Sequence, residues 1–239
     1  MAGLVPIIFR IPNQKKTTKS ANLAEGILNF LKRLINQISK RSKEFLMHFI
    51  ITYDNILNMK IAFVGPPAVG KDAVSDFIAQ KFSLRHISSG NIVRNYAKEN
   101  NLGSFDRDNL RVVANKMRTE FGGDILVQIA LQECPDDLVL SGLRSIDEVT
   151  TFKKNGGIII CITAPLAKRY ELAKIRGRIG DNVSFDDFRL SEEKEYLNPD
   201  KNSQNVKQVI EMADTVIVND SGLEELFDKT YKIIADIKA

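Results

Sequence analysis

The pattern of apolar residues changes at Met59, and from there to the C-terminus short apolar runs alternate with segments of helical periodicity. Five apolar runs predict strands at residues 60–64, 84–87, 138–140, 157–162 and 215–218. Apolar residues three and four positions apart predict helices at residues 70–82, 91–98, 106–121, 124–133 and 145–154, at segments that begin near Pro165 and Ser184, and at residues 223–237. Ser145 with Glu148 three residues later predicts a capping box that opens the helix at residues 145–154. This alternation indicates an α/β fold with a five-stranded parallel sheet and helices on both faces.

Residues 1–58 lack the strand–helix alternation and are predicted to form a basic N-terminal extension, helical or partly disordered, before a domain over residues 59–239. Apolar residues at helical spacing, with lysine and arginine between them, indicate an amphipathic helix around residues 27–38. Three interpretations stay open: a helix packed on the domain, a basic targeting or membrane-surface segment, and an incorrectly assigned start upstream of Met59. The apolar patch at residues 45–53 is too short to span a membrane, so no transmembrane segment is expected.

The basic charge is confined to that extension. Residues 1–58 contain nine lysines and arginines against three acidic residues, whereas residues 59–239 contain 25 against 27. The main domain is therefore slightly acidic, and we expect no nucleic acid as its partner. Two cysteines, Cys134 and Cys161, with Cys161 inside an apolar run, favour free thiols and a cytoplasmic location.

The strongest chemical signal follows the first predicted strand. The segment Gly65-Pro66-Pro67-Ala68-Val69-Gly70-Lys71-Asp72 matches the phosphate-binding pattern G-x-x-x-x-G-K and leads into the helix predicted at residues 70–82, where Ala73 is also expected to bind the nucleotide. Glycines let backbone N–H groups turn toward phosphate oxygens, and the helix N-terminus adds positive charge. Lys71 supplies a point charge to the β- and γ-phosphates, so the sequence predicts a P-loop that binds a nucleoside triphosphate.

Asp72 occupies the position where a P-loop usually carries serine or threonine as a Mg²⁺ ligand. A carboxylate can also bind Mg²⁺, directly or through water. Alternatively, Asp72 only stabilises the helix N-terminus.

Further segments carry a family resemblance. Ile87-Ser88-Ser89-Gly90-Asn91-Ile92-Val93-Arg94 resembles the strand-to-helix segment of adenylate kinases and related nucleoside monophosphate kinases. Leu138-Val139-Leu140-Ser141-Gly142-Leu143-Arg144 resembles their third strand, and Thr163-Ala164-Pro165 with Arg169, Arg176, Arg178 and Asp181 resembles their fourth strand and lid. The pattern after Gly142 and the late strand that ends at Asn219 are most similar to the dephospho-CoA kinase-like branch, including an archaeal-type family. The resemblance covers residues 60–239.

The resemblance implies a P-loop NTPase fold with an arginine-bearing lid at about residues 176–200, ATP and Mg²⁺ as cofactors, and a small-molecule acceptor. It implies that Ser89, Arg94, Arg118, Gly142 and Arg144 contact the acceptor, and that Arg169, Arg176 and Arg178 close over the transferring phosphate. Arg144 also stands at the carboxyl end of a strand, where open α/β sheets bind ligands. Asn219 is expected beside the adenine or as a cap on the loop.

One position departs from the family pattern. Where these enzymes usually carry an aspartate that helps to hold Mg²⁺, this chain has Ser141. We therefore expect Asp72 and Ser141 to have exchanged roles at the metal, although weakened metal binding is the alternative.

The predicted function is ATP-dependent phosphotransfer to a small acceptor, with Lys71, Arg144, Arg169, Arg176 and Arg178 as catalytic residues in a monomer or homodimer. The identity of the acceptor stays open. A nucleoside monophosphate would present its phosphate to Arg144, whereas dephospho-CoA would present a hydroxyl and need a carboxylate base such as Asp72 or Asp181. The G-K-D sequence of the loop also resembles that of some deoxynucleotide and phosphomevalonate kinases, which keeps those substrates open. A non-catalytic nucleotide-binding protein is the alternative. A P-loop motor or DNA-processing ATPase is disfavoured by the acidic main domain.

Overall fold

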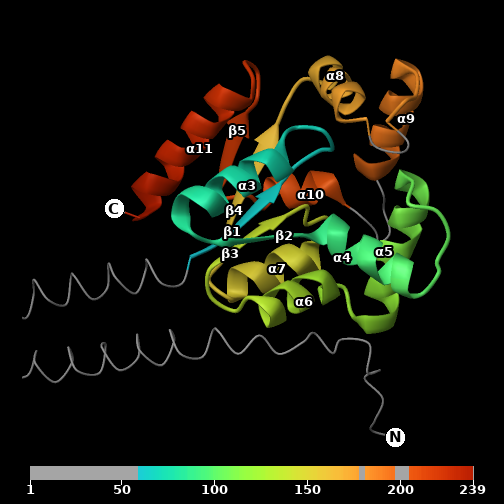
Figure 1. Cartoon of the computed structure of the whole chain (residues 1–239), viewed down its shortest axis with the longest axis horizontal. Coiled ribbons are helices and arrows are strands. Elements are labelled where there is room, and N and C mark those ends of the chain that lie inside the picture. Colours follow the sequence, from blue (N-terminus) through green and yellow to red (C-terminus); the bar gives the residue numbers. More distant parts are fainter. Residues whose placement is uncertain (1–58, 178–180, 197–204, 239) are drawn as a thin grey trace, which may run out of the picture. The chain divides into compact units, whose positions relative to one another are not determined.

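The computed structural model describes residues 59–177, 181–196 and 205–238 (Figure 1). The predicted extension at residues 1–58 lies outside the described residues, as do Arg178 and part of the predicted lid. The described elements in chain order are β1 (Lys60–Val64), α3 (Lys71–Phe82), β2 (Arg85–Ser88), α4 (Ser89–Glu99), α5 (Arg107–Phe121), α6 (Ile125–Glu133), β3 (Leu138–Ser141), α7 (Ile146–Lys154), β4 (Ile158–Thr163), α8 (Leu166–Arg176), α9 (Phe185–Tyr196), α10 (Val206–Glu211), β5 (Thr215–Val218) and α11 (Leu223–Lys238).

The predicted five-stranded parallel sheet is confirmed, and each strand lies within one residue of its expected place. The strands are ordered β2-β3-β1-β4-β5, and every neighbouring pair is parallel. The sequence analysis missed α10, a short helix whose first turn is capped by the Asn205 side chain, which accepts a hydrogen bond from the Gln208 amide. Within the described part of the chain, no helix is long and apolar enough to cross a membrane.

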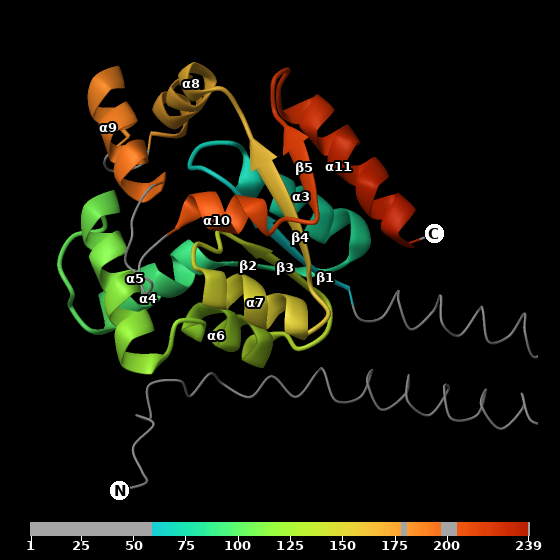
Figure 2. The same cartoon turned by 180° about the vertical axis from the view of Figure 1, so that it is seen from behind.

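Alternate side chains of the central strand enter two different cores. Ile61 and Phe63 pack in a cluster with residues of α3 and α11, whereas Ala62 and Val64 pack in a cluster with residues of α4 to α7. Figures 1 and 2 show the corresponding layers, with α3 and α11 on one face of the sheet and α6 and α7 on the other. Burial on both faces explains why the strands are near-continuous apolar runs in the sequence.

The order of the strands determines where a ligand can bind. The chain leaves β1 for β2 at one edge, returns through β3, and then crosses β1 to reach β4 and β5. Connections therefore diverge at the carboxyl ends of β1 and β3, which is the switch point where open α/β sheets place their ligands. The P-loop follows β1 and Arg144 follows β3, so this topology brings both to one edge of the sheet.

The turn out of β1 requires glycine. Gly65 has φ +126°, and a Cβ atom at this position would lie 2.0 Å from the carbonyl oxygen of Ile162 on β4. The loop therefore approaches the backbone of the neighbouring strand so closely that any side chain would displace it.

We expect Gly65→Ala to lower the free energy of unfolding much more than Gly222→Ala. Gly222 has a similar φ of +147° but nothing within 4 Å of its Cβ position, so it isolates the cost of backbone strain. That strain costs about 1–3 kcal/mol in both variants, and the clash with Ile162 adds about 1–3 kcal/mol to Gly65→Ala alone. Urea unfolding of both variants measures the difference, and equal losses would contradict the proposed close approach.

Candidate functional site

The P-loop wraps around the ammonium group of its own lysine. Lys71 Nζ donates hydrogen bonds to the carbonyl oxygens of Gly65 at 3.0 Å and Pro66 at 2.5 Å. Asn219, directly after β5, stabilises the loop from the protein interior. Its buried side-chain amide donates a hydrogen bond to the Val69 carbonyl at 3.0 Å. Because Lys71 is the first residue of α3, its charge stands where the helix dipole is also positive.

The surroundings of Lys71 disfavour its charged form. Burial, together with the positive charges of Arg144 and Arg176, lowers the pKa of Lys71 from 10.5 to about 7 against the opposing effects of Asp72 and Glu192. A bound polyanion would restore the charged form, because phosphate oxygens would replace lost hydration and neutralise the neighbouring guanidinium groups.

Asp72 is held by a chain of hydrogen bonds that runs away from the loop. Ser141 at the end of β3 donates its hydroxyl to Asp72 Oδ1 at 2.9 Å, and Ser141 Oγ lies 3.0 Å from His86 Nε2 on β2. His86 Nδ1 in turn lies 2.6 Å from Asp76 Oδ1, one helical turn after Asp72 on α3. The two positions that depart from the family pattern, 69 residues apart, are therefore in direct contact.

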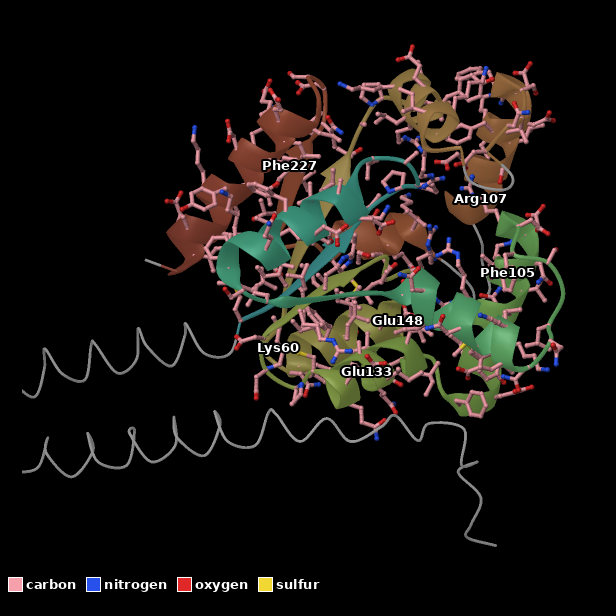
Figure 3. All side chains as sticks on the ribbon, viewed as in Figure 1. Lys60, Phe105, Arg107, Glu133, Glu148 and Phe227 are labelled. Atoms are coloured by element: carbon pink, nitrogen blue, oxygen red, sulfur yellow. The ribbon has the colours of Figure 1, made fainter. Side chains whose placement is uncertain are left out.

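A cavity of about 610 Å³ opens beside the loop. Its wall includes Lys71 and Asp72 from the P-loop side, Arg144 from the end of β3 and side chains of α4 and α5. Phe105 and Arg107, labelled in Figure 3, line it at the start of α5. Some of the residues predicted to bind the nucleotide and some of those predicted to bind the acceptor thus line the same cavity.

Basic residues outnumber acidic ones in the cavity wall. Two acidic residues, Asp72 and Asp181, are set against seven basic ones, namely Lys71, Arg94, Arg107, Arg111, Arg118, Arg144 and Arg176. Asp181 accepts two hydrogen bonds from Arg176, at 2.9 and 2.7 Å. Such a wall fits a ligand that carries several negative charges.

Arg111 has an unused hydrogen-bond donor. Its Nη2 pairs with the exposed carboxylate of Asp108 at 2.9 Å. Its Nη1 is buried and has no hydrogen-bond partner among the described residues. A buried, unpaired donor on a guanidinium group is costly unless a ligand completes it, so Arg111 points to an anion in the α5 side of the cavity.

Arg118 and Glu148 form a buried ion pair at the wall of the cavity. Arg118 donates to Glu148 Oε1 from Nε at 2.9 Å and from Nη2 at 2.8 Å, and both side chains are inaccessible to solvent. Glu148 Oε2 accepts the backbone N–H groups of Arg144 at 2.7 Å and Ser145 at 3.2 Å. The predicted capping box of Ser145 and Glu148 is confirmed, and it fixes the backbone of Arg144 at the cavity.

Comparison with known proteins gives the family. Residues 64–184, just over half of the chain, match the family model described as AAA domain. A UPF0200 protein of Thermococcus onnurineus is 30% identical over 76% of this chain and 99% of that protein. A UPF0200/UPF0201 protein of Archaeoglobus fulgidus is 31% identical over 75% of this chain, which spans only 56% of that relative's length.

This chain belongs to the UPF0200 family. The shikimate kinase of Bacteroides thetaiotaomicron superposes with a TM-score of 0.51 over 74% of this chain and 98% of that enzyme, at 11% identity. That likeness shows the P-loop kinase fold. The predicted fold class and the resemblance to P-loop small-molecule kinases are confirmed.

The structure brings only part of the expected site of this UPF0200 chain to the cavity. The predicted residues that line it are Pro67, Ala68, Lys71, Asp72, Ser89, Arg94, Arg118, Gly142, Arg144 and Arg176. Arg169 instead donates to the Ala164 carbonyl and pairs with Glu192 of α9, which also pairs with Arg107. Asn219 takes the loop-capping geometry, and Ser141 is fully buried behind Asp72. Arg178 lies outside the described residues.

Sequence reasoning missed two arginines of α5, Arg107 and Arg111. On a predicted surface helix they are indistinguishable from solvated charges, and Arg111 even has an acidic neighbour three positions before it. Their place in the cavity depends on how α5 packs against the rest of the domain.

The lowered pKa of Lys71 predicts that ATP binding takes up a proton. At about pH 8 ligand-free Lys71 is mostly neutral, and bound phosphates raise its pKa, so close to one proton enters; at about pH 6 Lys71 contributes little. The affinity for ATP should therefore fall as pH rises above about 7. Calorimetry with EDTA, in buffers of different ionisation enthalpy, measures the uptake.

Lys71→Arg provides the matched control, because a guanidinium group stays protonated throughout this range. Protons that ATP itself exchanges are common to both proteins and cancel in the difference. Equal uptake by Lys71→Arg and the unaltered chain at about pH 8 would contradict the interpretation.

Proposed function

We propose that this protein is an ATP-dependent phosphotransferase that acts on a small, phosphate-bearing acceptor. The observation that carries the proposal is the continuity of one cavity from Lys71 of the P-loop to the arginines of α4 and α5. Phosphoryl transfer needs two substrates in line and neutralised oxygens more than it needs covalent chemistry from the protein. A shared cationic cavity meets both needs.

On the donor side, residues 65–73 hold the triphosphate of ATP. The backbone of the loop and the N-terminus of α3 supply N–H donors, and Lys71 leaves the Gly65 and Pro66 carbonyls to bind the β- and γ-phosphates. Asn219 supports this indirectly, since its amide fixes the loop at Val69.

The residues beside Lys71 fit Mg²⁺. Asp72 offers a carboxylate, a hard oxygen ligand, and lines the cavity. Proteins usually bind Mg²⁺ through one or two carboxylates and substrate phosphates while the ion keeps several waters, so a single carboxylate from the loop would be enough. Asp72 is the proposed ligand, and Ser141 orients it. Bound Mg²⁺ would supply charge neutralisation on the phosphates.

On the acceptor side, Arg94, Arg111 and Arg144 bind an anionic group. Arg111 carries the unpaired donor, and the Arg118–Glu148 pair holds the backbone of Arg144 in place. Apolar residues of the same wall, Val93, Phe105, Leu110, Ala114 and Leu126, fit the less polar part of the acceptor.

A nucleoside monophosphate-like acceptor agrees with this wall better than a hydroxyl acceptor such as dephospho-CoA. Transfer to a phosphate oxygen needs no base. A hydroxyl acceptor needs a carboxylate, and of the two that line the cavity Asp181 is engaged by Arg176 while Asp72 is assigned to the metal. Arg176 stands at the end of α8, so it is the described lid residue that is placed to stabilise the transferring phosphate.

The test is ADP formation from ATP and Mg²⁺ with a panel of nucleoside monophosphates, dephospho-CoA and shikimate. We expect a nucleoside monophosphate to accelerate ATP consumption and to become a diphosphate. Arg111→Gln should raise the KM of the acceptor by about tenfold or more while the KM of ATP stays within about twofold, since it removes a charged hydrogen bond.

Arg189→Gln is the control variant, because Arg189 pairs with Glu193 on the surface of α9 and does not line the cavity. If ATP binds but no acceptor raises its consumption, the non-catalytic nucleotide-binding alternative is favoured instead.

A further inference from the structure

His86 and Asp76 have no part in the function proposed so far, yet they join the P-loop through a continuous chain of hydrogen bonds. The chain runs from Asp76 to His86, from His86 to Ser141 and from Ser141 to Asp72, with heavy-atom distances of 2.6, 3.0 and 2.9 Å. Its two ends, Asp72 and Asp76, are one turn apart on the same side of α3. The histidine and the serine therefore bridge two carboxylates of one helix.

The sheet sets the geometry of this bridge. In the parallel pair of β2 and β3, His86 is level with Val139 and Ser88 is level with Ser141, so His86 and Ser141 are two positions out of register and on the same face. α3 packs on that face, with contacts to both strands. The bridge thus joins three elements, β2, β3 and the first turns of α3.

The hydrogen atoms of the chain can be assigned by counting donors. Ser141 has one hydroxyl hydrogen, which goes to Asp72, so His86 Nε2–H donates to Ser141 Oγ. The ionised Asp76 carboxylate only accepts, so Nδ1–H of His86 donates to it. With all three hydrogen bonds made, His86 is an imidazolium that donates outward from both ring nitrogens, from Nδ1 to Asp76 and from Nε2 to Ser141, whose hydroxyl donates in turn to Asp72.

An aspartate at this loop position has more freedom than the usual serine or threonine. Its carboxylate can rotate toward the lysine, the helix N-terminus or solvent, and a metal ligand must hold one orientation. The Ser141 hydroxyl, itself fixed by His86, restricts that rotation.

We propose that His86, oriented by Asp76, is a positioning residue that acts through Ser141 to hold the Asp72 carboxylate for the Mg²⁺ of the bound nucleotide. This inference rests on the proposed assignment of Asp72 as the metal ligand. Partners of this kind behind a metal ligand contribute about 10–100-fold to metal affinity in other proteins.

A different use of the same three side chains is excluded by burial. Asp76, His86 and Ser141 resemble the order of a serine-nucleophile triad. Ser141, however, has no solvent-exposed surface, and its hydroxyl hydrogen is directed to a carboxylate rather than to an open space. It can orient a neighbour but cannot attack a substrate.

The experiment compares the dissociation constant of ATP in EDTA with that in Mg²⁺, by calorimetry on the full chain. We expect His86→Leu to leave the constant in EDTA within about twofold of the unaltered protein, and to reduce the tightening by Mg²⁺ by about tenfold. His86→Gln, whose amide N–H can replace Nε2–H, should recover most of that tightening. Arg85→Leu, on the same strand but paired with Glu133, is the control and should change neither constant.

Two further variants test whether Asp76 orients His86 and whether His86 acts through Ser141. Asp76→Ala alters a side chain that is 73% exposed, so it should leave folding intact while it reduces the Mg²⁺ effect in the same direction as His86→Leu. In a Ser141→Ala background His86→Leu should have little additional effect, since the link to Asp72 is already broken.

The outcomes separate this inference from the function on which it rests. If Mg²⁺ tightens ATP binding to the unaltered chain and to His86→Leu equally, or if His86→Leu loses as much in the Ser141→Ala background, the positioning role is overturned and the proposed function stands. If Mg²⁺ changes ATP binding to none of the proteins, both this role and the assignment of Asp72 to the metal are overturned.

Discussion

The buried ammonium group of Lys71 is the constraint on which the site depends. The ammonium group donates hydrogen bonds to two backbone carbonyl oxygens of the loop. Burial and the repulsion from two nearby arginines lower its pKa to about 7. Burial of a charge without full compensation is unfavourable, so the folded domain retains it at a cost in stability. In the proposed function a bound polyanion would offset this cost, because phosphate oxygens would favour the charged form of Lys71.

The rest of the fold positions groups around that charge. The strand order brings the ends of β1 and β3 together, the close approach of Gly65 to Ile162 fixes the loop, and Asn219 braces it from β5. The buried pair of Arg118 and Glu148 then holds Arg144 at the same cavity. Because each of these contacts joins elements that are distant in sequence, the site forms only when the whole domain folds.

Much of this architecture could be predicted from the sequence, because strands buried on both faces and the P-loop leave local signals. The capping box of Ser145 was equally readable. The contacts of the site were harder, since they depend on packing: Arg118 was expected to touch the acceptor and proves to be tied to Glu148 within the cavity wall, and Arg111 carried no signal at all. The substitution of Asp72 and Ser141 suggested that the two act together, but the part played by His86 required the register of β2 on β3.

The most direct test of this account is the pair of measurements on Lys71→Met, the free energy of unfolding without ligand and the affinity for ATP. Methionine keeps the bulk of the side chain and removes the buried charge. The account predicts an unfolding free energy that is equal to that of the unaltered protein within about 1 kcal/mol, or higher, together with a loss of ATP affinity of about 100-fold or more. A Lys71→Met protein that is destabilised by several kcal/mol and still binds ATP like the unaltered chain would contradict it.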